Sequence, residues 1–245
     1  MKSIFKKEMN QYFKSMVGYI FLAIFLAITG YYFTVNNLLA QSSDVKEYFN
    51  TMIFTLMFLI PILTMRLLAE ERKTKTDQLL YTAPISIKDI VLGKYLAAFT
   101  VFLMGLAVTA VYVAAIAVLG SLEVYTAIGC YAGIIFAAGC FIAMGLFISS
   151  VTENQVVAAI LTYALLLGLY VLSLLTGYVS DPVLVAILDW LAVFRRFTDF
   201  TMGIFNPAAA LYYVSLSWLF LFLTIYVTKR RMGNSGSERT GEQAA

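Results

Sequence analysis

Residues 124–149 read VYTAIGCYAGIIFAAGCFIAMGLFIS, a stretch without a single Asp, Glu, Lys or Arg. An α-helix needs about 20 apolar residues to cross the hydrocarbon core of a bilayer, so this stretch predicts a transmembrane helix. Five further apolar blocks of the same character lie at 17–39, 51–69, 95–119, 155–175 and 208–228. The sequence therefore predicts an all-α polytopic membrane protein with six transmembrane helices.

The composition of the whole chain agrees with a membrane protein. Of its 245 residues, 61% are hydrophobic and 13% are charged, and the mean hydropathy is +0.85. Soluble domains carry about twice that share of charged residues. A basic N-terminus followed by an apolar run also resembles a signal peptide, but the run over 17–39 is longer than a cleavable hydrophobic region. We interpret it as a retained first span.

The side chains available argue against an enzyme and against an ion-coupled carrier. The chain has no histidine, and its two cysteines, Cys130 and Cys140, lie inside one apolar block, where we interpret them as packing residues. No charged residue falls near the middle of any predicted span, where ion-coupled carriers place their binding groups. The sequence thus indicates no catalytic residue, no cofactor-binding residue and no metal ligand.

The distribution of Lys and Arg predicts the orientation, because cytoplasmic segments of membrane proteins retain these residues. If the N-terminus is inside, 14 of the 17 Lys and Arg residues lie on the inner side, and only Lys46, Arg195 and Arg196 lie outside. We therefore expect a multi-pass protein of a bacterial-type cytoplasmic membrane, with both termini in the cytoplasm. The polar tail 229–245 is expected to be disordered.

The first 16 residues have the pattern of an amphipathic helix. Phe5, Met9, Tyr12, Phe13 and Met16 recur at helical spacing, and the lysines occupy other faces. Such a helix lies in the membrane interface before the chain enters its first span. The alternative is a basic flank without a defined structure.

The segment 178–206 mixes apolar anchors with Asp189, Arg195, Arg196 and Asp199, which is too polar for the centre of a bilayer. We place it on the outer face, as one or two short helices that are interfacial or re-entrant.

Two further features concern the spans. Pro61 predicts a kink in the second span, either a hinge or a static bend. Small residues in the fourth span, including Gly129 and Gly133, predict close helix packing.

The charged segment 70–94 between the second and third spans contains two helix-start signals. Thr74 with Asp77, and Ser86 with Asp89, each resemble a capping box, and Pro84 ends a helix before it. The pattern predicts a short helix over 75–82 on the cytoplasmic face. Its apolar residues suit either a docking surface for a protein partner or an interfacial connector between two spans.

Several features in a fixed order resemble the ABC-2 type permeases of ATP-binding-cassette transporters, particularly the six-span kind similar to gliding-motility and nitrous-oxide-accessory permeases. They are the N-terminal amphipathic "elbow" at 1–16, Glu70-Glu71-Arg72 at the end of the second span, KTDQLL at 75–80 before Pro84-Ile85-Ser86, IVLGK at 90–94, SSVTENQ at 149–155 and FTDFTMGI at 197–204. The features extend over most of the chain.

The resemblance implies roles for particular residues. The helix over 75–82 corresponds to the coupling helix, which docks on the nucleotide-binding subunit. Its docking residues are Lys75, Thr76, Asp77, Gln78, Leu79, Leu80 and Tyr81, with Leu79 and Leu80 as the apolar knobs. Transmission of the movement is assigned to Glu70, Glu71, Arg72 and Pro61. A second inner contact is assigned to Thr152, Glu153 and Asn154.

The resemblance also implies partners. The chain has no G-x-x-x-x-G-K-[ST] motif, so ATP and Mg belong to a separate ABC ATPase subunit. A second permease copy, identical or related, is expected, and no nucleic acid. We expect export of a substrate, which the sequence leaves open; polar residues within the spans, such as Tyr32 and Asn36, suit an amphipathic or lipid-like compound. The alternatives are a membrane scaffold that anchors a cytoplasmic partner without transport, and a secondary carrier.

Overall fold

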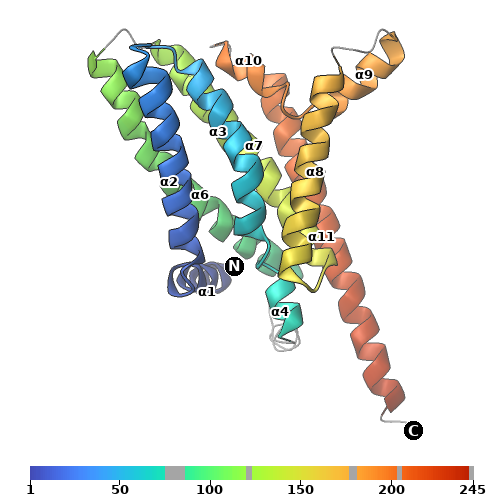
Figure 1. The fold of residues 1–245 in the computed structure, drawn as a ribbon. Helices are drawn as coiled ribbons and strands as arrows, with labels where there is room; N and C mark the ends of the chain where they lie inside the picture. Colours follow the sequence, from blue (N-terminus) through green and yellow to red (C-terminus); the bar gives the residue numbers. More distant parts are fainter. Residues whose placement is uncertain (75–85, 120–122, 177–180, 203–205, 243–245) are drawn as a thin grey trace.

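The computed structural model describes residues 1–74, 86–119, 123–176, 181–202 and 206–242, and within them it contains helices and no strand (Figure 1). The long helices are α2 (Val17–Phe33) with its π-helical continuation η1 (Thr34–Leu39), α3 (Lys46–Thr64), α6 (Ile87–Leu119), α7 (Val124–Val151), α8 (Gln155–Leu175) and α11 (Pro207–Glu242). The short helices are α1 (Lys2–Lys14), α4 (Ala69–Lys73), α9 (Pro182–Leu191) and α10 (Phe197–Thr201).

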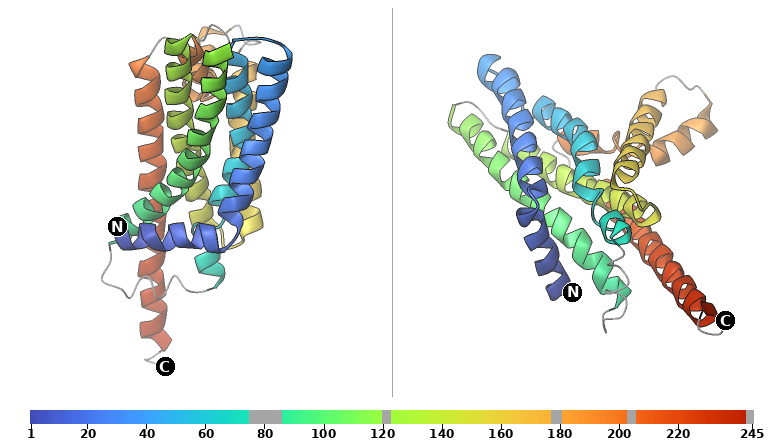
Figure 2. Two further views of the ribbon diagram at one scale, coloured as in Figure 1. Left: turned by 90° about the vertical axis from the view of Figure 1, so that its left-hand side faces the viewer. Right: turned by 60° about the horizontal axis from the view of Figure 1, so that its bottom comes forward.

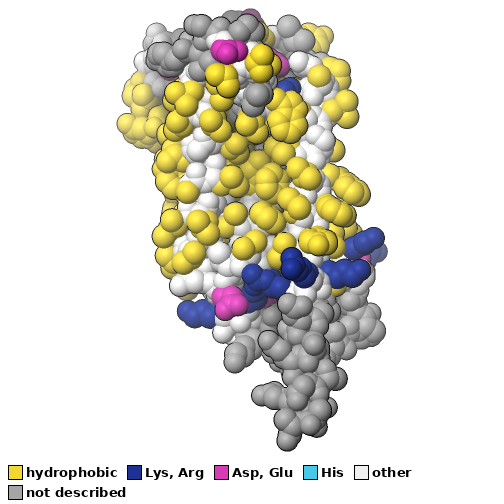
Figure 3. Space-filling model, turned by 90° about the vertical axis from the view of Figure 1, so that its right-hand side faces the viewer, with side chains coloured by type: hydrophobic (Ala, Val, Ile, Leu, Met, Phe, Trp, Pro, Cys, Tyr) yellow, Lys and Arg dark blue, Asp and Glu magenta, His cyan; other side chains and the backbone are white. Residues whose placement is uncertain are grey.

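Among the residues that the structure describes, six helical segments are long and apolar enough to cross a membrane, which confirms the predicted six-span, all-α class. They are Val17–Leu39, Lys46–Lys73, Ile87–Val118, Val124–Val151, Gln155–Leu175 and Pro207–Arg231. A space-filling view shows hydrophobic side chains over the middle of the molecule, and Lys and Arg gathered along the lower edge of this band (Figure 3). We call this edge the basic end and the opposite edge, which carries α9 and α10, the far end.

The fourth span, α7, lies at the centre of the bundle and packs most extensively against α11 and α3. Small residues make this possible. A Cβ atom on Gly145 would lie 2.2 Å from Thr64 Oγ1, and one on Gly133 would lie 2.9 Å from Phe200 Cβ. Both glycines therefore admit a neighbour from another part of the same chain. The predicted close packing of this span occurs within the subunit.

The helix α1 lies across the ends of the spans instead of parallel to them (Figure 2). It joins α2 through Met16, whose φ of 61° is left-handed and turns the chain sharply. The face of α1 that is buried carries Ile4, Glu8 and Tyr12, and it packs on α6. Of the predicted apolar face, Tyr12 is buried, Phe5, Met9 and Phe13 are partly exposed, and Met16 is exposed.

The segment after the fifth span forms two short helices, α9 and α10, at the far end (Figure 1). Phe194, Phe197 and Phe200 are buried in the core, whereas Val183 and Trp190 on α9 are exposed. Tyr213 in α11 donates a hydrogen bond to the carbonyl of Val193 at 2.6 Å, which fixes the segment to the last span. The last helix, α11, is described as far as Glu242.

Candidate functional site

A cluster of four charges, three of them buried, connects three segments at the basic end. Lys94 Nζ, in α6, lies 2.8 Å from Glu8 Oε1 in α1 and 3.0 Å from Glu71 Oε2 in α4. The other oxygen of Glu71 pairs with Lys7 Nζ at 3.0 Å. The side chains of Lys94, Glu8 and Glu71 are only 1%, 5% and 9% exposed. We call Lys7, Glu8, Glu71 and Lys94 the four-charge cluster.

The four-charge cluster is electrically balanced, with two ammonium and two carboxylate groups. Burying one charge without a partner is costly, and a buried pair is tolerated when geometry and hydrogen bonding are good. Lys94 meets this condition because its ammonium group donates to a carboxylate on each side. A displacement of α4 away from α6 would break the Glu71–Lys94 pair and leave Lys94 with one of its two carboxylates. The cluster therefore favours movement of α1, α4 and the start of α6 as one unit.

The elbow helix α1 contacts α6 closely at one point. A Cβ atom on Gly93 would lie 2.9 Å from Ile4 Cγ2, so only glycine admits α1 at this distance. Because Gly93 directly precedes Lys94, the close approach brings Glu8, one turn beyond Ile4, within reach of the ammonium group. The Gly93-Lys94 pair thus combines steric access for α1 with the charge that holds it.

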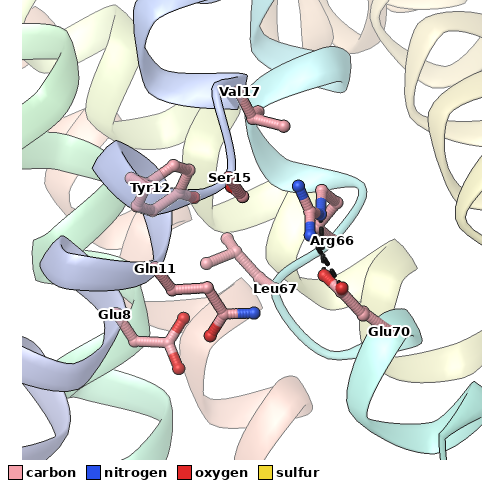
Figure 4. A pocket seen from close by; sticks show the side chains of 8 residues that line it. All are labelled: Glu8, Gln11, Tyr12, Ser15, Val17, Arg66, Leu67 and Glu70. Atoms are coloured by element: carbon pink, nitrogen blue, oxygen red, sulfur yellow. Dashed lines mark hydrogen bonds and ion pairs between the residues drawn. The ribbon is translucent and has the colours of Figure 1, made fainter.

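A second set of contacts joins α1 to the end of α3. Tyr12 donates to the carbonyl of Leu63 at 2.9 Å. Burial, and secondarily the Glu8 carboxylate, raises the pKa of Tyr12 well above its ordinary value, so the phenol stays protonated and remains a donor. Arg66 pairs with both oxygens of Glu70 at 2.7 Å. A water-sized cavity separates the two contacts (Figure 4).

The second span is interrupted at 65–68, between α3 and α4, and Ser149 of α7 supports the interruption. Its hydroxyl accepts hydrogen bonds from the backbone N–H groups of Leu68 and Ala69 at 3.0 and 3.1 Å, and donates to the carbonyl of Met65 at 3.2 Å. Backbone groups that a broken helix leaves unpaired are thereby satisfied. The break lies after Pro61, which is buried in the regular part of α3.

Three of the four predicted transmission residues lie on α4, the helix that carries Glu71 of the cluster; the fourth, Pro61, lies in α3. Glu71 belongs to the four-charge cluster, Glu70 pairs with Arg66, and Arg72 lies on the same short helix, α4. The predicted docking helix, 75–82, lies outside the described residues. Its two flanks are described. The chain leaves α4 at Thr74, whose hydroxyl donates to the carbonyl of Glu70 at 2.9 Å, and enters α6 at Ile87.

The predicted second inner contact lies at the turn between α7 and α8, also at the basic end. Glu153 and Asn154 are exposed, and Asn154 caps α8 by accepting a hydrogen bond from the N–H of Val156 at 2.9 Å. Arg231, near the end of the last span, donates to the carbonyl of Val151 at 2.8 Å. The turn thus presents polar groups on the same side of the molecule as α4.

Residues of this site to which the sequence prediction gave no individual role include Lys7, Glu8, Lys94 and Ser149. Glu8 is the only carboxylate in a strongly basic helix, and it shares a face with Ile4 and Tyr12, which is a signal for a specific partner. Lys94 lies at the start of an apolar block, where an isolated lysine requires an anion. Ser149 carried no comparable signal. The described residues contain no group of His, Cys, Asp or Glu suited to a metal ion.

One comparison with known proteins identifies the chain's relationships. A family model described as "ABC-2 family transporter protein" matches residues 2–227, which is nearly the whole length. The match begins in α1 and ends within the last span, so it includes all three segments joined by the four-charge cluster. No curated protein matches the chain.

Proposed function

The chain belongs to the ABC-2 family of transporter proteins, and from this premise we propose that it is the membrane-spanning permease of an exporter driven by a separate ATPase. The observation that carries the proposal is the four-charge cluster. It connects the elbow α1, the end of the second span and the start of the third, and the predicted docking helix lies in the chain between the last two.

The cluster supports a route from the ATPase to the spans. A partner that moves the segment 75–82 would pull on α4 at one end and on α6 at the other. Since Glu71 and Lys94 are paired and buried, both ends and α1 would move together. The movement would reach the second span at the break over 65–68, which Ser149 supports from α7. Pro61 then serves as a hinge above the break.

Orientation and partners follow from the same proposal. The basic end is cytoplasmic, because positively charged segments are retained on that side. The N-terminus and the end of α11 lie at this end (Figure 1). Two permease copies, identical or related, and two ATPase subunits form the transporter. ATP and Mg are bound by the ATPase, whose second contact is the turn Thr152–Asn154.

The test is affinity purification of the tagged chain from gently solubilised native membranes, followed by mass spectrometry. We expect an ATPase with a Walker A motif in stoichiometric amount. The variant L79D/L80D is expected to lose the ATPase while still inserting in the membrane, because two carboxylates cannot occupy an apolar docking groove. The control is Val183→Asp/Leu184→Asp, which puts two carboxylates at exposed apolar positions of α9 at the far end and keeps the knobs. Recovery of the chain alone, or with a partner that is not an ATPase, would favour a membrane scaffold.

A further inference from the structure

A cavity of about 550 Å³ opens at the far end, between the second and fifth spans. It is bounded by α3 on one side, by α8 on the other, and by the segment leading into α10. The lining residues are Tyr32, Glu47, Asn50, Thr51, Ile53, Phe54, Tyr170, Ser173, Leu174, Phe194, Arg195, Phe197 and Thr198. On α3, Glu47, Asn50, Thr51 and Phe54 follow helical spacing, so one face of this helix forms the wall.

The inner part of the cavity is aromatic. The rings of Phe54 and Tyr170 lie 5.4 Å apart, and those of Tyr170 and Phe194 lie 5.3 Å apart, both edge to face. The aromatic series continues toward the basic end through Phe58, which lies 5.3 Å from Phe54 and 5.1 Å from Tyr163. Aromatic rings present negative faces that attract cations, and they also accept apolar groups.

The cavity lining contains one carboxylate, Glu47, and one guanidinium, Arg195. Arg195 is paired with Asp189, so its positive charge is compensated. Glu47, in the first turn of α3, is exposed and forms no ion pair within the described part of the chain. The cavity thus has one uncompensated carboxylate at its polar rim, above aromatic walls. Asn50, Thr51 and Thr198 add neutral hydrogen-bonding groups to the same rim.

We propose that this cavity binds a lipophilic organic cation, with its charge near Glu47 and its apolar groups against Phe54, Tyr170 and Phe194. A metal ion would find a single carboxylate among mostly apolar walls. An anion would find the same carboxylate, and a guanidinium, that of Arg195, which is already paired with Asp189. The cavity is large enough for a drug-sized compound. That the bound cation is the exported substrate rests on the proposed function. That the cavity binds such a cation does not depend on it.

The test compares two probes of nearly the same shape and opposite charge, tetraphenylphosphonium and tetraphenylborate. Binding is measured with the purified chain in lipid nanodiscs, by displacement of radiolabelled probe with unlabelled probe. Empty nanodiscs give the signal due to partition into lipid. We expect saturable, protein-dependent binding of the phosphonium and none of the borate. Equal binding of the two probes, or no saturable binding of the phosphonium, would overturn the proposal.

Variants locate the binding in the cavity. Glu47→Gln should weaken binding of the phosphonium about 5-fold, the effect of losing a partly exposed opposite charge. Phe54→Ala should weaken it by a similar factor, since it removes an aromatic wall. The matched control is Glu123→Gln, which neutralises a carboxylate that lines a different cavity at the far end. An equal loss in Glu123→Gln would show a general surface effect and would contradict the site.

The binding experiment and the purification experiment fail independently. If the chain binds the phosphonium but co-purifies with no ATPase, the proposed cation site is supported and the proposed exporter function is contradicted. If an ATPase co-purifies but the chain does not bind the phosphonium, the proposed exporter function is supported and the proposed cation site is contradicted. If both succeed, the phosphonium should also change the ATP hydrolysis rate of the complex, and Glu47→Gln should reduce that change.

Discussion

Lys94 and Glu8 are 86 residues apart in the chain, yet the Nζ of one lies 2.8 Å from the Oε1 of the other in an environment that excludes solvent. The pair connects the elbow helix to the third span, and Glu71 extends the connection to the second span. An ion pair in this position affects one kind of movement more than another. It resists separation of the three segments and has little influence on their common displacement relative to the rest of the bundle.

Lys94→Met is expected to destabilise the protein strongly, because it leaves the Glu8 and Glu71 carboxylates buried near each other without their common partner. Breaking a buried ion pair from one side costs about 3–5 kcal/mol. The measurement is the midpoint of thermal unfolding in detergent, compared with the wild type. Lys88→Met is the matched control, since Lys88 is an exposed lysine on the same helix.

A double-substitution cycle separates the pair from the rest of the cluster. Glu8→Gln combined with Lys94→Met should cost less than the sum of the two single changes, because each single change leaves an uncompensated charge that the double change removes. Additive losses would mean that Glu8 and Lys94 stabilise the protein independently, and the proposed connection between elbow and third span would have to be abandoned.

Ser149→Ala should lower the free energy of unfolding by about 1–3 kcal/mol, because it removes the acceptor for two buried backbone N–H groups at the break in the second span. Ser150→Ala is the control. Ser150 is equally buried, but its hydroxyl donates only to the carbonyl of Phe147 in its own helix. We expect little change there. Denaturation followed by circular dichroism measures both variants, and similar losses would argue against a special role for Ser149.

Gly145→Ala should be destabilising by about 1–3 kcal/mol, since the new methyl group would meet the side chain of Thr64 at the crossing of α7 and α3. Gly168→Ala provides the comparison, because its Cβ would meet nothing within 4 Å and alanine favours helix over glycine. It should be neutral or slightly stabilising. Thermal unfolding of the two variants gives the difference; a loss at Gly168 as large as at Gly145 would contradict the packing explanation.

The sequence predicts the class of the fold well because bilayer thickness sets the length of each apolar block. It also predicts one or two short helices over 178–206, since charges such as Asp189 and Arg195 could not lie in the hydrocarbon, and α9 and α10 lie in this segment. Hydropathy carries no information about pairing across the chain, however. Lys94 and Glu8 meet only because Gly93 admits Ile4, a contact between segments far apart in sequence.

The candidate site was partly predictable, because charged residues next to an apolar block are easy to recognise in the sequence. Glu70, Glu71 and Arg72 stand out as charges at the end of an apolar block, and a family resemblance gives them a role. Ser149 is a residue type that is common near helix ends, so the sequence does not mark it out. Its role depends on where α7 meets the broken second span. Local patterns identify which residues are unusual, whereas tertiary packing determines which of them act together.

The sidedness of the two ends can be measured directly. Cysteine introduced at Ser43, near the start of α3 at the far end, should react in intact cells with a maleimide that cannot cross the membrane. Cysteine at Asn154, in the exposed turn at the basic end, should react only after the membrane is opened. The native Cys130 and Cys140 are buried, so background labelling should be small, and the unsubstituted chain provides this control. The expected pattern follows from retention of Lys and Arg in the cytoplasm. Labelling of Asn154→Cys in intact cells would place the basic end outside, where no ATP-driven partner could reach the segment 75–82, and the proposed function would fail with it.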